Sequence, residues 1–186
     1  MRADVEPCVV SRQSNRIAES LAIPVESVRR SMEAADLVVE SAPEKAAGML
    51  AEAVLAGGQF GGPELERATE RLERLPHGDD PVLELILDLA VGAATSLRGT
   101  ATEPIQVSEA TIEEVAQVAT SPLDLFWAGR GFFMIGRNLE ASRVARRAID
   151  IARDGEATGL LPQLLRLRAA ADYDRGEWLA ARAAAS

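Results

Sequence analysis

The chain has 186 residues, of which 47% are apolar but only 4% aromatic. This length suffices for one domain with a sizeable core, and the abundance of Ala, Leu and Val favours closely packed helices over a β-sandwich. A formal net charge of −9 argues against a nucleic-acid-binding module, because phosphate binding needs a basic surface.

The sequence also indicates the cellular compartment in which the protein is expected. The single cysteine, Cys8, can form no internal disulfide and fits a reducing environment. No basic stretch followed by an apolar one marks a signal peptide. The most apolar run, "VLELILDLAVGAATSL", contains Glu84 and Asp88 and is shorter than the ~20 residues that span a bilayer. We therefore expect a cytoplasmic protein without membrane contact.

Prolines mark the predicted helix starts. Pro24, Pro43, Pro81 and Pro122 each stand just ahead of a helical pattern, where the missing N–H costs nothing. Possible side-chain caps accompany several starts, namely Ser41 with Glu44, Asp80, Thr111 with Glu114, and Ser121. The predicted helices cover 11–21, 24–39, 43–56, 63–74, 81–98, 108–119, 122–136, 138–153, 160–175 and 177 onward.

No segment shows a convincing strand pattern, so the predicted fold class is all-α. Most connections are short, which makes consecutive helices antiparallel neighbours and predicts stacked helix hairpins. We divide the chain into an N-terminal hairpin over 1–40 and a helical array over 41–186.

The N-terminal hairpin has the pattern of a helix–turn–helix. The apolar residues of its first helix would pack on Val25, Val28 and Met32, leaving Ser27, Arg29 and Arg30 exposed as candidate DNA contacts. Three acidic residues nearby would repel phosphate, namely Glu19, Glu26 and Glu33. A winged-helix remnant that binds no DNA and an ordinary array hairpin are the alternatives.

An internal repeat emerges when Gly136 is aligned with Gly176. The first copy has an aromatic residue, Phe132, among small residues at Gly129, Gly136, Ala141, Ala145 and Ala148. The second copy has Ala169, Gly176, Ala181 and Ala185, but Asp172 replaces the aromatic. Small residues allow two helices to cross at close range, and glycine suits the tight turn between them.

This pattern resembles the tetratricopeptide repeat, although the two glycines lie farther apart than its usual period of about 34 residues. The resemblance implies antiparallel hairpins stacked as a right-handed superhelix. Residues 120–186, particularly "AIDIARDGEATGLLPQLLRLRAAADYDRGEWLAARAAAS", are similar to the helical-repeat sensor region of large bacterial LuxR-type regulators, the group that includes the maltose-regulon activator.

The LuxR-type resemblance implies a larger parent protein with a nucleotide-binding domain, a winged helix, the array and a C-terminal promoter-binding domain. Here "GGQFGG" lacks the Lys and hydroxyl of a phosphate loop, and no promoter-binding helix–turn–helix follows the array. We expect a fragment or a shortened relative that keeps the array.

The tetratricopeptide resemblance also places the first helix of each hairpin along a concave groove. The groove positions are then Phe126, Arg130 and Phe133, followed by Arg166, Ala170 and Tyr173 in the next copy. Two arginines beside aromatic rings can bind a carboxylate, a phosphate or an acidic peptide. The alternative is that both phenylalanines belong to the core and both arginines are solvated.

Other polar groups have simpler interpretations. His77 lies in a turn beside Asp79 and Asp80, and with no second histidine it is a poor metal ligand, so we expect neither metal nor cofactor. No nucleophile–base arrangement is evident, and we expect no enzymatic activity. The basic patch of Arg143, Arg146, Arg147 and Arg153 is interpreted as a solvated helix face.

The expected function is therefore a non-enzymatic sensor or protein-interaction module of a LuxR-type transcriptional regulator. It would bind a peptide, protein or small effector in its groove. The alternative is a small stand-alone DNA-binding regulator that uses the N-terminal hairpin. Because solenoids normally cover their ends, the last helix, which packs through Ala181 and Ala185, should meet a second copy as a homo-oligomer or else fray.

Overall fold

A computed structural model of the chain describes residues 25–58, 61–75, 79–99, 107–155 and 157–185. Within these ranges the elements are helical and no strand occurs, which confirms the all-α prediction. The predicted helix over 11–21 lies outside them. The described helices are one over residues 25–38, α2 (Pro43–Gly57), α3 (Pro63–Leu72), α4 (Pro81–Leu97), α5 (Glu109–Val118), α6 (Pro122–Met134), α7 (Asn138–Asp154), the 3₁₀ turn η1 (Thr158–Leu160), α8 (Leu161–Asp174) and α9 (Trp178–Ala185).

Helix starts follow the prolines and two of the predicted caps. Proline stands in the first turn of α2, α3, α4, α6 and α8. Asp80 caps α4, where its carboxylate accepts a hydrogen bond from the backbone N–H of Val82 at 2.9 Å. Ser121 caps α6 by accepting from the N–H of Asp124 at 3.3 Å. Both caps satisfy backbone donors that have no partner inside the helix.

The other two predicted caps are wrong. The Ser41 hydroxyl donates backwards to the carbonyl of Val38 at 3.3 Å, and α2 begins after Ala42 without a side-chain cap. Thr111 lies inside α5, whose cap is the earlier Ser108. In both places a hydroxyl residue stood at the right spacing from a glutamate, but the chain enters the helix at a different residue.

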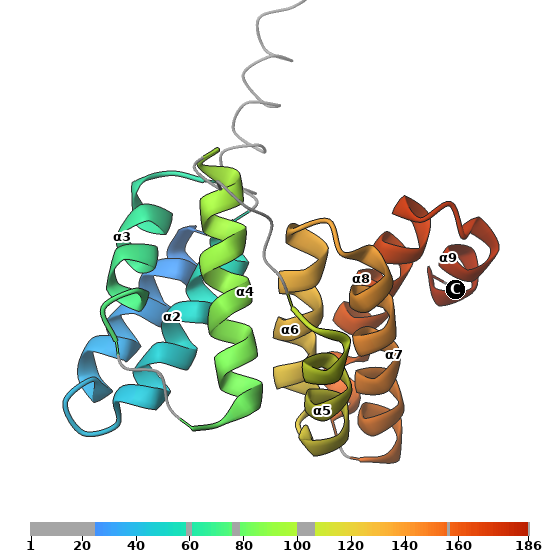
Figure 1. The fold of residues 1–186 in the computed structure, drawn as a ribbon, viewed down its shortest axis with the longest axis horizontal. Coiled ribbons are helices and arrows are strands. Elements are labelled where there is room, and N and C mark those ends of the chain that lie inside the picture. The colour runs from blue at the N-terminus through green and yellow to red at the C-terminus, as the bar shows by residue number, and fades with distance from the viewer. Residues whose placement is uncertain (1–24, 59–60, 76–78, 100–106, 156, 186) are drawn as a thin grey trace, which may run out of the picture.

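The described helices form two groups (Figure 1). The helix over residues 25–38, α2, α3 and α4 make one group, and α5 to α9 make the other, with α4 beside α6. Val28 is buried at the close approach to Gly57, where an added Cβ would lie 2.9 Å from the Val28 side chain. The described part of segment 1–40 thus shares the core of the first group.

Helix α6 connects the two groups, since it contacts α2 and α4 on one side and α7 and α8 on the other. Two of its glycines allow the close approach. A Cβ at Gly131 would lie 2.6 Å from the Cβ of Leu89 on α4. A Cβ at Gly129 would lie 3.1 Å from Leu167 on α8. The small residues therefore let the α6 backbone pack tightly against both neighbours.

The aligned glycines of the repeat adopt the same turn. Gly136 and Gly176 have φ of +79° and +78°, in the left-handed region that glycine enters without strain. In the first turn Arg137 N–H donates to the carbonyl of Phe132 at 2.9 Å, and in the second Glu177 N–H donates to that of Asp172 at 2.9 Å. These bonds close the helix end in the Schellman pattern. The alignment of Gly136 with Gly176 thus relates two turns of one geometry.

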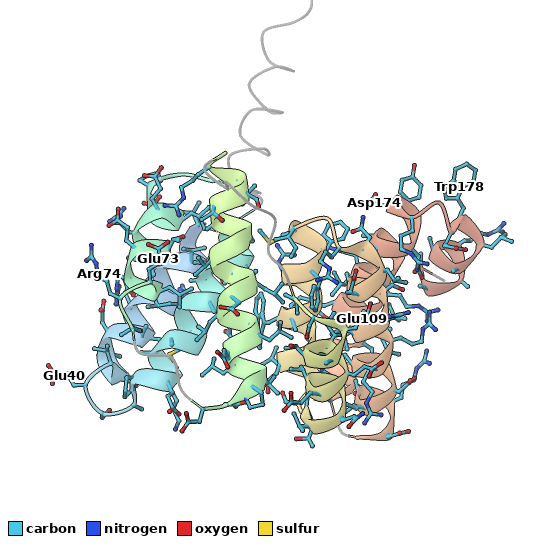
Figure 2. All side chains as sticks on the ribbon, in the orientation of Figure 1. Glu40, Glu73, Arg74, Glu109, Asp174 and Trp178 are labelled. Atoms are coloured by element: carbon cyan, nitrogen blue, oxygen red, sulfur yellow. The ribbon has the colours of Figure 1, made fainter. Side chains whose placement is uncertain are left out.

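The C-terminal helix packs on α8 through one face only. Ala181 and Ala184 are buried, whereas Ala185, predicted as a packing position, is exposed. Trp178 and Leu179 are 70% and 85% exposed, and Trp178 projects from this end of the molecule (Figure 2). The expectation that a second copy covers this end, or that it frays, stays a prediction.

Candidate functional site

A small pocket between α6 and α8 brings together the predicted groove residues, with the exception of Tyr173. Its volume is about 140 Å³. It is lined by Phe126, Arg130, Phe133, Gln163, Arg166, Leu167 and Ala170. Tyr173 is 65% exposed and lies outside this lining, at the last turn of α8. The first helices of two successive hairpins therefore form the two walls of one pocket.

Arg130 lies partly buried at the junction of the two helix groups. Its Nε–H donates to the backbone carbonyl of Leu55, in the last turn of α2, at 2.7 Å. The terminal carbonyls of a helix lack partners inside it and carry partial negative charge, so a guanidinium suits this place. Burial, followed by the positive charge of Arg166, lowers the pKa of Arg130.

Arg166 reaches the same pocket from α8 and is exposed. Among the described residues, no carboxylate forms an ion pair with Arg130 or with Arg166. Two positive charges thus face one small space, and none of the described residues that line it is acidic. This arrangement costs electrostatic energy when the pocket is empty and favours a bound anion.

The phenylalanines supply the apolar part of the lining. Phe126 packs edge-on against Trp127, with ring centroids 5.0 Å apart and an interplanar angle of 64°. Phe126 and Phe133 are half-buried, so each touches the core and still faces the pocket. The two rings therefore pack against the core and also line the pocket, and their role in ligand binding stays a prediction. Aromatic walls and burial reduce the access of water to the Arg130 guanidinium, which strengthens its interaction with an anion.

The candidate DNA contacts lie on the helix over residues 25–38, where Arg29 and Arg30 are exposed and Ser27 is exposed as well. Arg29 is ion-paired with Glu26 at 2.7 Å and with Glu33 at 3.1 Å. Arg30 is ion-paired with Glu26 at 2.9 Å. The Arg29 hydrogen bonds, then those of Arg30, lower the pKa of Glu26. Carboxylates therefore engage all three guanidinium nitrogens of Arg29 and Nε of Arg30, and the DNA-binding alternative stays a prediction.

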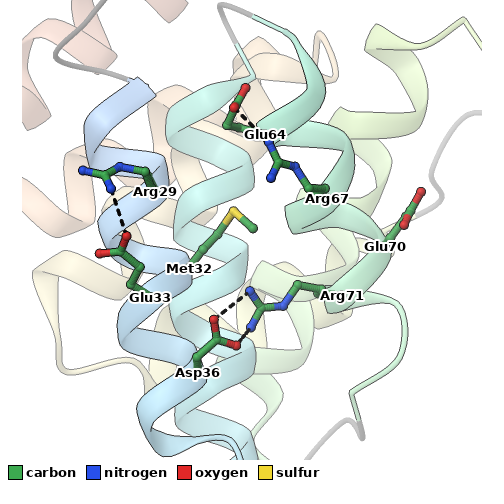
Figure 3. Close-up of a pocket in the computed structure, with 8 residues that line it drawn as sticks. All are labelled: Arg29, Met32, Glu33, Asp36, Glu64, Arg67, Glu70 and Arg71. Carbon is green, nitrogen blue, oxygen red and sulfur yellow. Dashed lines mark hydrogen bonds and ion pairs between the residues drawn. The ribbon is translucent and has the colours of Figure 1, made fainter.

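A larger pocket of about 460 Å³ separates this helix from α3 (Figure 3). Its apolar contact is Met32, and its walls are charged. Here each arginine has an acidic partner: Arg29 pairs with Glu33, Arg67 with Glu64 at 2.9 Å, and Arg71 with Asp36 across the two helices. Its charges are thus matched within the chain, in contrast to those of the α6–α8 pocket.

The remaining predictions concern α7 and metal binding. Arg143, Arg146, Arg147 and Arg153 are exposed on α7, as expected for a solvated face, and Arg143 pairs with Glu109 at 3.3 Å.

His77 lies outside the described residues. Among those that are described, no group of three or more His, Cys, Asp or Glu side chains is placed to hold a metal ion. None of the described helices is both long and apolar enough to cross a membrane.

Sequence reasoning missed a buried ionic cluster between α7 and α8. Asp172 is 1% exposed and accepts a hydrogen bond from the buried Ser142 hydroxyl at 2.5 Å. Its carboxylate also lies 3.5 Å from Arg168 and 3.4 Å from Arg175. The spacing of Arg168 and Arg175 around Asp172, at i−4 and i+3, was the signal available in the sequence.

A second missed feature is an acidic pair near the start of α6. Burial, then the charge of Asp124, raises the pKa of Glu52 on α2, while Trp127 opposes this as the smallest effect. The indole Nε1 of Trp127 is buried and has no hydrogen-bond partner of ordinary geometry among the described residues. Burial also raises the pKa of Asp124, opposed by Ser121 and reinforced by Asp80.

Comparison with known proteins gives no relative: no family model, no curated protein and no solved structure matches the chain.

Proposed function

We propose that the protein is a non-enzymatic helical-repeat module that binds an anionic group of a partner in the pocket between α6 and α8. The observation that carries the proposal is the pair Arg130 and Arg166, which share a partly apolar pocket without an acidic counterion among its lining residues. Guanidinium groups offer several N–H donors in a planar arrangement that matches carboxylate and phosphate oxygens.

The volume of the pocket limits the size of the group that it can bind. At about 140 Å³ it falls below the roughly 300–1,000 Å³ of sites that enclose drug-sized molecules. It accommodates a side-chain-sized group, while the remainder of the ligand would lie on the surface of α6 and α8. A peptide or protein that presents one acidic side chain fits these dimensions better than a buried cofactor.

The proposal also covers the stacking of the hairpins and the larger protein in which they would act. The two equivalent Schellman turns, at Gly136 and Gly176, support a tetratricopeptide-like stacking of the α6–α7 and α8–α9 hairpins in a right-handed superhelix. We infer from the sequence resemblance that this array serves as the sensor or interaction region of a LuxR-type transcriptional regulator in the cytoplasm. In that role, occupancy of the pocket would change the contacts that the regulator makes.

The proposal is tested by fluorescence anisotropy with a labelled hexaglutamate peptide and a hexaglutamine control in about 0.15 M salt, where long-range repulsion is screened. The hexaglutamate should bind at least about tenfold more tightly than the control. Arg166→Gln should weaken its binding by about tenfold, because one charge-assisted contact is lost.

Arg147→Gln is the matched control, since Arg147 is an exposed arginine of α7 that does not line the pocket. It should leave the affinity unchanged. Equal binding of the two peptides would contradict the proposal, as would an equal loss of affinity in the Arg147 and Arg166 variants.

A further inference from the structure

We propose that the anion for which this pocket is suited is a phosphate monoester carried by a side chain of a peptide partner. This inference rests on the function proposed above and specifies its ligand. It is based on the charge balance of the pocket, on its dimensions and on the placement of its two guanidinium groups.

The charge balance favours a dianion. Arg130 and Arg166 together present two positive charges, and the other lining residues are neutral: Phe126, Phe133, Gln163, Leu167 and Ala170. A carboxylate would neutralise one charge and leave the other uncompensated beside apolar walls. A phosphate monoester carries about −1.5 to −2 charges at pH 7 and offers three acceptor oxygens, so it can serve both guanidiniums at once.

The placement of the donors also suits a tetrahedral group. Arg130 reaches the pocket from α6 and is fixed by its hydrogen bond to Leu55, 2.7 Å from Nε. That bond occupies Nε and leaves the terminal amino groups of the guanidinium for a ligand. Arg166 reaches the pocket from α8, a different helix. Donors from two sides can engage different oxygens of one phosphoryl group, whereas a planar carboxylate is matched by a single guanidinium.

The dimensions indicate a phosphorylated side chain and not a larger phosphate ester. A pocket of about 140 Å³ holds the phosphoryl group and the carbon that bears it. Phe126 and Phe133 border it, and such rings pack well against the methylene of phosphoserine. The peptide backbone would then remain outside, on α6 and α8.

The test is isothermal titration calorimetry of the full chain with three peptides that differ at one central residue: phosphoserine, serine or glutamate. At pH 7.5 the phosphoserine peptide should bind at least about tenfold more tightly than the serine peptide and about threefold more tightly than the glutamate peptide. Arg166→Gln should abolish the advantage of phosphoserine over glutamate, and Arg147→Gln should preserve it.

A change of pH from 7.5 to 5.5 distinguishes the two peptides further, because only phosphoserine loses charge over this range. With a second phosphate pKa of about 6, the dianionic fraction falls from about 0.97 to about 0.24. Because the monoanion should bind about as tightly as glutamate, phosphoserine affinity should drop about twofold, and its advantage over glutamate should fall from about threefold to about 1.5-fold. The glutamate peptide should change little. The pocket lining contributes only the two arginines as charged groups, and the nearby Asp124 and Glu52, whose pKa values are raised, would affect both peptides alike.

The outcomes distinguish this inference from the proposed function. Equal affinity for glutamate and phosphoserine overturns the inference and leaves anion binding intact. No binding of any acidic peptide, or phosphoserine binding that Arg166→Gln does not weaken, overturns both. Inorganic phosphate that binds as tightly as the phosphoserine peptide overturns the assignment to a peptide side chain.

Discussion

Asp172 and Phe132 occupy equivalent positions of the repeat, yet they are chemically opposite. Both side chains are almost completely buried, at 1% and 0% exposure. Phe132 fills its place with an apolar ring, whereas a buried carboxylate needs counter-charges and donors. Asp172 obtains them from Ser142, Arg168 and Arg175. The second hairpin therefore depends on an ionic cluster where the first depends on aromatic packing.

Glu52 presents the reverse case, a half-buried carboxylate whose surroundings disfavour its charge. Its folded-state pKa is raised, mainly by burial and then by Asp124. A raised pKa means that the folded state binds the proton more tightly than the unfolded state does. The resulting contribution to stability is fully present below the unfolded pKa, near 4.5, and is lost as the pH rises through the folded pKa.

Glu52→Gln should therefore stabilise the protein at pH 7, by on the order of 0.5 kcal/mol, because it removes the charge that burial disfavours. The gain should shrink as the pH falls towards 4.5. Urea unfolding at the two pH values measures both effects. Glu113→Gln, at an exposed position of α5, is the control and should show no comparable gain. A loss of stability at pH 7 in the Glu52 variant would contradict this account.

At the scale of the helices, the packing of α6 on α4 depends on the absence of a side chain at Gly131. A Cβ there would lie 2.6 Å from the Cβ of Leu89, a contact that only movement of a helix can relieve. Gly48 on α2 offers a comparison, because the nearest atom to its Cβ would be Leu83 Cδ1 at 3.6 Å, an ordinary contact.

Gly131→Ala should consequently destabilise the protein by about 1–3 kcal/mol, the usual effect of overpacking a core. Gly48→Ala should be neutral or stabilising by up to about 1 kcal/mol, because alanine is the better helix former. Chemical denaturation of both variants measures the difference. Equal stability of the two variants would show that α6 and α4 can separate at little cost.

The sequence was sufficient to predict most helices and most of the pocket lining. Prolines and caps fixed the starts of α4 and α6, and the aligned glycines predicted two equivalent turns. It did not predict the contacts made across long separations. Arg130 binds the carbonyl of Leu55, and Asp172 binds Ser142 on another helix. Such partners become neighbours only when helices pack, which no local pattern specifies.

Tyr173 shows a limit of reasoning by repeat. It is equivalent to Phe133 when Gly136 is aligned with Gly176, and the repeat therefore predicted it as a groove residue. The pocket, however, requires two facing helices, and its walls are α6 and α8. Alignment of the two copies predicts where a residue lies within its hairpin. Whether that position lines a pocket depends on the helix that packs beside it.

For the whole molecule, the pocket lies within the second helix group, and Arg130 links it to the first group. Helix α6 contacts both groups, Arg130 extends from it to the end of α2, and Arg166 belongs to α8. The local positive charge stands out against the net charge of −9. An anion held between the two guanidiniums would bind α6 to α8 directly and would act on α2 through Arg130. Ligand binding in this pocket is therefore expected to stabilise the junction.

The most direct test of anion binding at this place is the NMR spectrum of the arginine Nε–H groups of the full chain, titrated with the hexaglutamate peptide. The account predicts that the signals of Arg130 and Arg166 shift progressively, whereas those of Arg146 and Arg147 on α7 stay in place. Unchanged signals of Arg130 and Arg166, or larger shifts at Arg29, Arg67 and Arg71 in the other pocket, would contradict it.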